Sequence, residues 1–408
     1  MPPSRAAAAG LDARYHRSVP QTRTAARRGT TATSRAGSAT RSRTNGRATP
    51  AWPANAPAPI LVEERRGAIT ESRHRGHVVQ VGPDGAIERA IGDPEIVVTL
   101  RSAVKPFALM AMVESGAADE LHLTEPELAV MAASHHGEDL HVRTLQAIFR
   151  RAALSQNLLA CGADRAPLDE LTRIRLARDG ETPGPIRHMC SGFHAASIFL
   201  SRHAGWSLED YWHADHPSQV AVRSAVARCF GTVPDALVTA GDDCGVLTYA
   251  FPLVEVARAF ALLADPTGAS DPRRAALAPW LTRIRDAMLA APELVGGSRG
   301  SLTTSVMKAA APHLVSKSGA EALEGVGFVP GGGGAVRGGL AAKIDDGDGR
   351  DRALGPVVVE ALSQVGCLDD RAVRSLAAFA RPSARDAHGD VVAHAVPVFE
   401  LAPISELV

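Results

Sequence analysis

Two short runs of alternating apolar and polar residues begin the patterned part of the chain, at residues 77–81 and 86–91. They flank Gly82-Pro83-Asp84-Gly85, a sequence of strong turn formers. This arrangement predicts a β-hairpin. The β-branched run over residues 96–100 predicts a further strand directly after it.

Helical patterns dominate the middle of the chain. An apolar helical stretch is predicted from Ser102 to about Glu114, and Thr124-Glu125-Pro126-Glu127 is a capping box that predicts a helix ending before Ser134. Helical periodicity then begins again at several later positions: Asp139, His194, Pro217, Leu253 and Asp271.

Strand patterns return near the C-terminal end. A strand-like block over residues 313–344, interrupted by the glycine run 331–334, precedes two predicted helices and a last strand near residues 391–401. Strands at both ends with helices between them predict an α+β fold, in which one antiparallel sheet with flanking helices unites the ends of residues 56–408.

Residues 1–55 have a different composition. They contain ten Arg, a single acidic residue and almost no large apolar residues. Such a segment cannot bury enough surface to offset the entropy of ordering, so we predict a disordered tail. The segment lacks the interleaved aromatic residues of a nucleic-acid-binding arm, so no nucleic-acid partner is expected.

Composition indicates a globular protein, with 45% hydrophobic and 22% charged residues in 408. Five widely spaced cysteines are odd in number and form no paired framework, which favours a reducing compartment, and we expect a cytoplasmic protein without a membrane partner. Four of the 44 basic residues are Lys, at positions 105, 308, 317 and 343. Each lysine is therefore a candidate for chemistry.

The first chemical motif is Ser102-Ala103-Val104-Lys105, at a predicted strand-to-helix junction. A spacing of three places the hydroxyl and the amine on one helical face, and a lysine of lowered pKa can activate a serine. The alternative is a helix-capping serine beside a solvated lysine. The apolar residues 106–113 that follow weigh against that alternative, because they leave the helix little polar surface.

The second motif is Lys317-Ser318-Gly319, which ends a strand-like run. Penicillin-recognising serine enzymes use Ser-x-x-Lys, a serine-containing loop and Lys-Ser/Thr-Gly in this order. Ser134, in Ser-His-His-Gly-Glu, fits the middle element. Two further segments, Cys190-Ser191-Gly192-Phe193-His194 and Asp242-Asp243-Cys244-Gly245, predict either a zinc site or two inert buried thiols.

Taken together, the motifs resemble the Rhizobium etli-type L-asparaginases, also called class 3 or asparaginase II, over about residues 57–408. The residues that carry the resemblance are Glu71-Ser72-Arg73-His74-Arg75-Gly76, Arg101-Ser102-Ala103-Val104-Lys105-Pro106, Val113-Glu114-Ser115-Gly116-Ala117-Ala118, Ser134-His135-His136-Gly137-Glu138, Cys161-Gly162, Cys190-Ser191-Gly192, His216-Pro217, Asp242-Asp243-Cys244-Gly245, Lys317 with Gly319-Ala320-Glu321, and Lys343-Ile344-Asp345-Asp346-Gly347-Asp348.

The resemblance implies a serine β-lactamase-like fold, a homodimer, and hydrolysis of L-asparagine to L-aspartate and ammonia. It implies two Ser-Lys pairs, Ser102 with Lys105 and Ser134 with Lys317. The charge of Lys317 and burial are expected to keep Lys105 neutral, so that Lys105 acts as the base for Ser102.

The resemblance also implies zinc bound by Cys190, Cys244 and a lysine, but position 193, where that lysine is expected, is Phe. Bound zinc is therefore doubtful from the sequence. A second departure lies in residues 297–307, where Arg299 stands in a shifted register.

Charge signs make Arg101, His194 and Asp242 the candidates for binding the charged groups of the substrate. Two alternatives stay open: a β-lactam-recognising Ser-x-x-Lys hydrolase, and a catalytically impaired relative that binds amino acids.

Overall fold

The computed structural model describes residues 56–163, 168–331 and 336–403. The predicted tail over residues 1–55 and most of the glycine run, residues 332–334, lie outside the described residues. Contacts gather the described residues into one compact unit. The predicted domain boundary at residue 56 stays a prediction.

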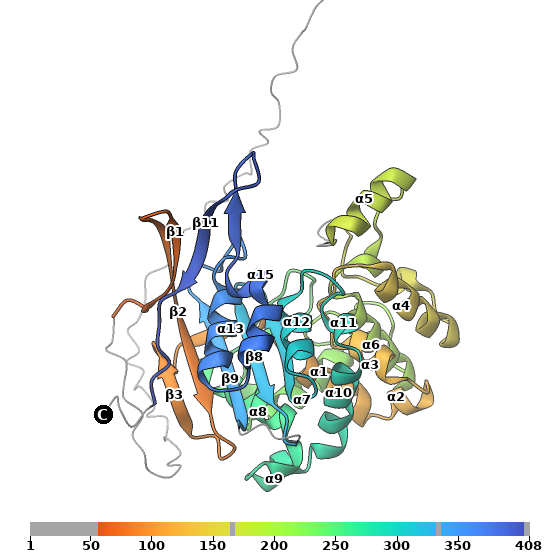
Figure 1. The fold of residues 1–408 in the computed structure, drawn as a ribbon. Coiled ribbons are helices and arrows are strands. Elements are labelled where there is room, and N and C mark those ends of the chain that lie inside the picture. Colours follow the sequence, from red (N-terminus) through yellow and green to blue (C-terminus); the bar gives the residue numbers. More distant parts are fainter. Residues whose placement is uncertain (1–55, 164–167, 332–335, 404–408) are drawn as a thin grey trace, which may run out of the picture. The chain divides into compact units, whose positions relative to one another are not determined.

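An antiparallel sheet joins the two ends of the described chain (Figure 1). The first strand pairs with the last, with Glu64 opposite Ala395, so the predicted union of the ends is confirmed. The hairpin is also confirmed, with Val79 opposite Ala90. The strands follow the order β10 (Ser383–Arg385), β11 (Val391–Pro397), β1 (Ile60–Arg66), β2 (Ile69–Val81), β9 (Gly338–Ile344), β8 (Leu323–Phe328) and β7 (Leu314–Gly319), and β3 (Ile87–Ile91) pairs with β2.

A second, smaller sheet, which the sequence patterns did not predict, holds the segment before Ser102. Its order is β4 (Val97–Thr99), β6 (Leu247–Pro252) and β5 (Val238–Gly241). Leu100 continues the contact, because its N–H donates to the carbonyl of Tyr249 at 2.8 Å. The strand end that carries Ser102 is thereby fixed to a segment almost 150 residues away.

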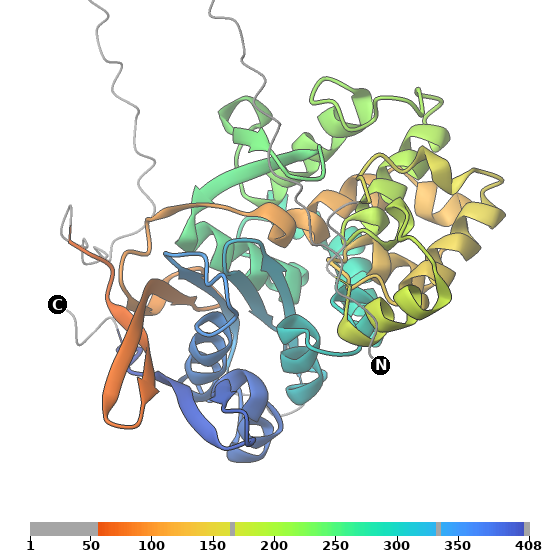
Figure 2. The ribbon, with the colours of Figure 1, turned by 90° about the horizontal axis from the view of Figure 1, so that it is seen from above.

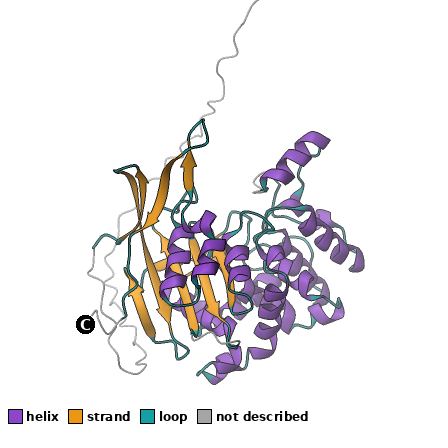
Figure 3. Ribbon diagram, viewed as in Figure 1, coloured by secondary structure: helices purple, strands orange, loops and turns teal. Residues whose placement is uncertain are grey.

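Helices lie on both faces of the large sheet and also gather beside it (Figures 2 and 3). Those between β4 and β5 are α1 (Lys105–Glu114), α2 (Ala117–Glu120), α3 (Glu125–Met131), α4 (Asp139–Arg151), α5 (Glu170–Asp179), α6 (Ser191–His203) and α7 (Pro217–Cys229). Those after β6 are α8 (Leu253–Ala264), α9 (Pro272–Ala275), α10 (Ala278–Ala290), α11 (Pro292–Val295), α12 (Leu302–Ala309), α13 (Leu354–Gln364), α14 (Asp370–Ser375) and α15 (Ala377–Ala380).

Helix α8 packs directly on β8 and β9, and glycines make this approach possible. A Cβ atom at Gly325 would lie 2.0 Å from the ring of Phe260, and one at Gly327 would lie 2.2 Å from the carbonyl oxygen of Phe260. Any side chain at these two positions would push the helix off the sheet. The close packing brings the helical layer near the edge strand β7.

The mixed architecture, an antiparallel sheet with flanking helices, agrees with the predicted α+β class. Two details differ. The helix predicted from Asp271 is interrupted between α9 and α10, and the two helices predicted before the last strand are α13 followed by the short α14 and α15. The more specific likeness to serine β-lactamases stays a prediction. Among the described residues, every helix is too short or too polar to traverse a lipid bilayer.

Candidate active site

Lys105 is buried at the first turn of α1, and its side chain is 3% exposed. The alternative of a solvated lysine beside a capping serine is therefore wrong. Its Nζ atom lies within hydrogen-bonding distance of three acceptors: the Ala133 carbonyl at 2.7 Å, Ser134 Oγ at 3.1 Å and Cys190 Sγ at 3.3 Å. An ammonium has three N–H donors, so this environment matches its full capacity.

Lys317 reaches the same hydroxyl from the other side. Its Nζ atom lies 2.9 Å from Ser134 Oγ and donates to the carbonyl of Ser318 at 2.8 Å. Two amines from segments more than 200 residues apart in the sequence thus bracket Ser134. The sequence-predicted pair of Ser134 with Lys317 is brought together, with Lys105 as a second neighbour.

Burial, together with the nearby charge of Lys105, lowers the pKa of Lys317 to about 7, although Glu324 and Cys190 act in the opposite direction. Neutral Lys317 is thus well populated at neutral pH. A neutral amine has a free lone pair, so the Ser134 hydroxyl can donate to Lys317 while it accepts from Lys105. In this arrangement the Ser134 hydroxyl links Lys105, the hydrogen-bond donor, to Lys317, the acceptor.

Ser102 lies one turn before Lys105, in the 3₁₀ helix Arg101–Val104. The backbone N–H of Lys105 donates to the carbonyl of Ser102, which closes this turn. The Ser102 side chain is 9% exposed, and its hydroxyl forms no hydrogen bond with the part of the chain that the structure describes. Ser102 therefore lies one turn from Lys105 along the backbone, and among the described residues no hydrogen bond joins its hydroxyl to Lys105 or Lys317.

Close backbone packing explains two glycines in these motifs. A Cβ atom at Gly319 would lie 2.3 Å from the carbonyl oxygen of Leu100, so only glycine lets β7 approach the segment of Ser102. A Cβ atom at Gly192 would lie 1.8 Å from the carbonyl oxygen of Val130, at the end of α3. Helix α6, which follows Cys190, can therefore contact the helix that leads to Ser134.

The loop after Ser134 is held by neutral histidine. His135 is fully buried, and burial lowers its pKa well below the usual value. Its Nδ1 atom accepts from the N–H of Gly137 at 3.1 Å, so its Nε2–H donates to Ser191 Oγ at 2.9 Å. This contact joins the loop of Ser134 to the first turn of α6.

Arg101 and Asp242 contact each other. The Arg101 guanidinium lies 3.0 Å from Asp242 and 2.7 Å from Asp243. The backbone of Arg101 has a φ of 46°, an uncommon conformation for a residue with a side chain. Its N–H donates to Thr248 Oγ1 at 2.8 Å. Strain of this kind directly before a candidate nucleophile is typical of functional sites.

His194 is completely buried, and burial lowers its pKa to about 4, so its ring is neutral at pH 7. The positive charge on which the sequence argument relied is absent. Its Nδ1 atom lies 2.7 Å from the hydroxyl of Tyr211, and its buried Nε2 atom has no hydrogen-bond partner among the described residues. Any contact with a substrate would therefore be a neutral hydrogen bond.

Cys190 and Cys244 are both buried free thiols, and their side chains are hydrogen-bonded to each other. This bond, with Lys105 and His188, keeps the pKa of Cys190 well below the usual value. Zinc prefers four ligands. Within the described ranges, no group of three His, Cys, Asp or Glu side chains is arranged to hold a metal, and Phe193 is buried in the core. The side chains do not fit the implied zinc site.

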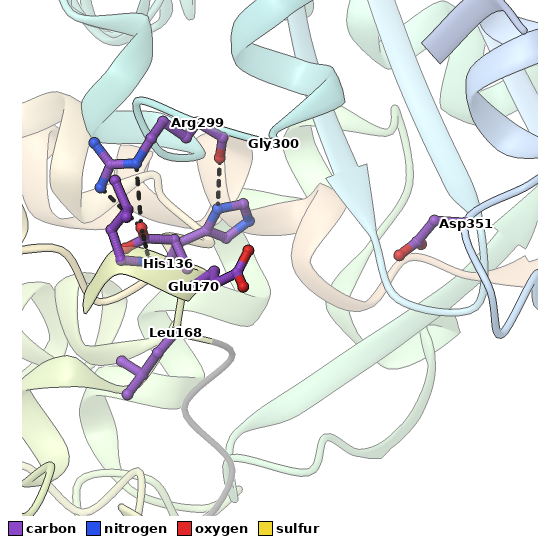
Figure 4. Close-up of a pocket in the computed structure, with 8 residues that line it drawn as sticks. His136, Leu168, Glu170, Arg299, Gly300 and Asp351 are labelled. Carbon is purple, nitrogen blue, oxygen red and sulfur yellow. Dashed lines mark hydrogen bonds and ion pairs between the residues drawn. The ribbon is translucent and has the colours of Figure 1, made fainter. Parts of the chain in front are cut away.

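A pocket of about 460 Å³ lies beside the loop of Ser134, lined by residues that include His136, Asp169, Arg299 and Asp351 (Figure 4). Arg299 lies 2.8 Å from Asp169, and its carbonyl is 3.1 Å from the His136 ring. None of the sequence-predicted site residues lines this pocket. The shifted segment that the sequence comparison singled out is thus part of its wall.

Three residues near the site were not found by sequence reasoning: Tyr211, Thr303 and Glu324. Tyr211 contacts His194, and Thr303 and Glu324 lie behind the strand of Lys317. Only Glu324 could have been identified from the sequence, because it is an acidic residue within an otherwise apolar, glycine-containing strand. The other two are recognisable only from their contacts.

Comparisons with known proteins give one informative match. A search of curated proteins returns no match. Two solved structures are similar in part: "Crystal Structure Analysis of Mglu", at 16% identity and a TM-score of 0.32, and "Crystal structure of Mglu in its L-glutamate binding form in the presence of 4.3M NaCl", at 16% identity and a TM-score of 0.29. The matches cover 71% and 70% of this chain, and 66% and 57% of those chains.

The family model for L-asparaginase II matches residues 62–397, which include the lysine cluster, both candidate serines and both buried thiols. The matched range also begins and ends in the paired strands β1 and β11. The chain therefore belongs to the L-asparaginase II family.

Proposed function

We propose that this protein hydrolyses the side-chain amide of L-asparagine to L-aspartate and ammonia by serine-lysine chemistry, in the manner of the Rhizobium etli-type enzymes. The observation that carries the proposal is the pair of buried lysines on either side of the Ser134 hydroxyl, with Ser102 one turn from Lys105. Family membership supports the substrate.

In the proposed reaction, Lys105 first passes a proton to Ser134, which passes its own proton to the neutral Lys317. Lys105 can then accept the proton of Ser102 while Ser102 Oγ attacks the amide carbon. Lys105 returns this proton to the leaving nitrogen, so ammonia departs and a β-aspartyl ester remains on Ser102. Water, deprotonated by Lys105, cleaves the ester, and Ser102 regains its proton as aspartate leaves.

The proposed substrate contacts are Arg101 to the α-carboxylate, Asp242 to the α-ammonium, and His194 Nε2 as a neutral hydrogen-bonding group. Arg101 and Asp242 already form an ion pair, so they offer both charges at one place. The α-carboxylate of a bound amino acid can take the place of Asp242 beside Arg101, and its α-ammonium can take the place of Arg101 beside Asp242.

The test compares Ser102→Ala with Ser134→Ala in an assay of ammonia release from L-Asn, with L-Gln and a β-lactam as alternative substrates. Ser102→Ala is expected to reduce kcat below about 1% of wild type without unfolding the protein, because no neighbour replaces a covalent nucleophile. Mass spectrometry should detect an aspartyl ester on Ser102 after rapid acid quench.

A second assignment has a specific observation in its favour, since both lysines contact Ser134 rather than Ser102. An ester on Ser134, together with an active Ser102→Ala variant, would make Ser134 the nucleophile. Hydrolysis of the β-lactam without ammonia release from asparagine would reject the proposed substrate. Asparagine binding without ammonia release in the wild type would indicate an amino-acid-binding relative.

A further inference from the structure

A second buried polar cluster lies behind the strand of Lys317, and the reaction as described above does not use it. Glu324 is on β8, opposite Ser318 on β7, and it is 0% exposed. Its Oε1 atom accepts from Thr303 Oγ1 at 2.9 Å and from Ser316 Oγ at 2.5 Å. Its Oε2 atom is buried and has no hydrogen-bond partner among the described residues.

Hydrogen bonds connect this carboxyl group to the site. The N–H of Ser318 donates to Thr303 Oγ1 at 3.2 Å, and the carbonyl of Ser318 accepts from Lys317 Nζ at 2.8 Å. Strand β7 is at the edge of the large sheet, so no strand of the described residues lies beside Ser318 on that side. The Thr303 side chain on α12 occupies that side instead, and its orientation is set by Glu324.

The charges in this region act on one another in a definite direction. A carboxylate at position 324 favours the ammonium form of Lys317, whereas burial and Lys105 favour the neutral form. Burial raises the pKa of Glu324 to about 7, opposed by the hydroxyl donors and by Lys317. The titratable groups that act on Lys317 are Lys105, Glu324 and Cys190, and the one that acts on Glu324 is Lys317.

We propose that Glu324 is a positioning residue for the reaction. Through Thr303 it holds the Ser318 carbonyl that binds the Lys317 amine, and its charge favours the protonated form of that amine after the proton has passed through Ser134. This inference rests on the proposed function. Its geometric part depends only on the contacts of Glu324, Thr303, Ser318 and Lys317.

The test uses the full-length protein and its four lysines, which make ¹³Cε-lysine NMR simple to assign. The Lys317 signal is identified by its loss in Lys317→Met. Glu324→Gln keeps the size and the acceptor oxygen but removes the charge, and it is expected to lower the pKa of Lys317 by about one unit or more. The matched control is Glu209→Gln, which removes a carboxylate from an exposed loop position and is expected to change nothing.

Kinetics give the second readout. In Glu324→Gln the rising limb of the pH profile of kcat/KM for ammonia release should move to lower pH, because the pKa of Lys317 is lower in this variant. Thr303→Val should lower kcat several-fold with little change in KM, and Thr303→Ser should restore it. Thr303→Val should also lower the pKa of Lys317, because Glu324 loses a donor that favours its charged form.

An unchanged pKa of Lys317 in Glu324→Gln would overturn the inference. If that variant does not fold, the same NMR titration is carried out on Thr303→Val and Thr303→Ser. Equal pKa values of Lys317 in these two variants would overturn the inference. A wild-type protein that releases no ammonia from asparagine would reject the proposed function instead. The NMR titration would still decide whether Glu324 controls Lys317.

Discussion

Replacing Lys317 with Met should make the protein inactive and more stable at pH 7. Lys317 is 1% exposed, and burial lowers its pKa from 10.5 to about 7. The unfolded chain, whose lysine keeps the higher pKa, therefore takes up a proton at pH 7. Each unit of difference corresponds to about 1.4 kcal/mol, so this uptake favours the unfolded chain by about 4 kcal/mol.

Methionine has a similar length and no charge to bury, so Lys317→Met removes this penalty. The variant also loses the contacts with Ser134 Oγ and the Ser318 carbonyl, at about 1 kcal/mol each. The net expectation is an increase of about 2 kcal/mol in the free energy of unfolding at pH 7.

The pH dependence follows with a definite sign. Because the folded-state pKa of Lys317 is the lower one, the wild type loses stability as pH falls from 10.5 to about 7, and this contribution is constant below pH 7. Lys317→Met should lack that slope. Urea unfolding at pH 7 and pH 9, followed by tryptophan fluorescence, measures both quantities.

Lys308→Met is the matched control, because Lys308 is exposed on α12 and its ion pair with Glu293 is partly exposed. It should change the free energy of unfolding by less than about 0.5 kcal/mol and leave ammonia release intact. A Lys317→Met variant that is less stable than wild type at pH 7, or that keeps the wild-type pH slope, would refute the assignment of a neutral buried amine.

Three further predictions concern the same region. The kcat/KM of the wild type should rise with pH and level off above about 7, with roughly tenfold lower activity per pH unit below it, because neutral Lys317 is the proton acceptor in the proposed reaction; a flat profile between pH 5 and 8 would argue against this role. Gly192→Ala should destabilise the fold by several kcal/mol in urea unfolding, because its Cβ atom would overlap the Val130 carbonyl, whereas Gly184→Ala, with open space around it, should not. Purified protein should hold less than one zinc per chain by elemental analysis, and Phe193→Lys should raise that content; full occupancy after mild chelation would implicate another ligand, such as His194.

The sequence alone predicted several of the elements and named candidate chemical groups. Alternating residues predicted the hairpin of β2 and β3, and the capping box at Thr124 predicted the start of α3. These signals are local, because turn formers and caps act on backbone groups a few residues away. The scarcity of lysine likewise drew attention to Lys105 and Lys317 before any contact was known.

Tertiary structure decided which groups meet and in which protonation state. The spacing of Ser102 and Lys105 predicted a pair, yet Lys105 contacts Ser134, because the end of α3 and the first turn of α6 close over it. Residue type assigned a charge to His194, but complete burial removes it. The β4-β6-β5 sheet and the cluster of Thr303 and Glu324 join segments that are distant in sequence or lie on different elements. Contacts of this kind, and the burial that sets each pKa, depend on the packing of the whole chain and leave no local pattern in the sequence.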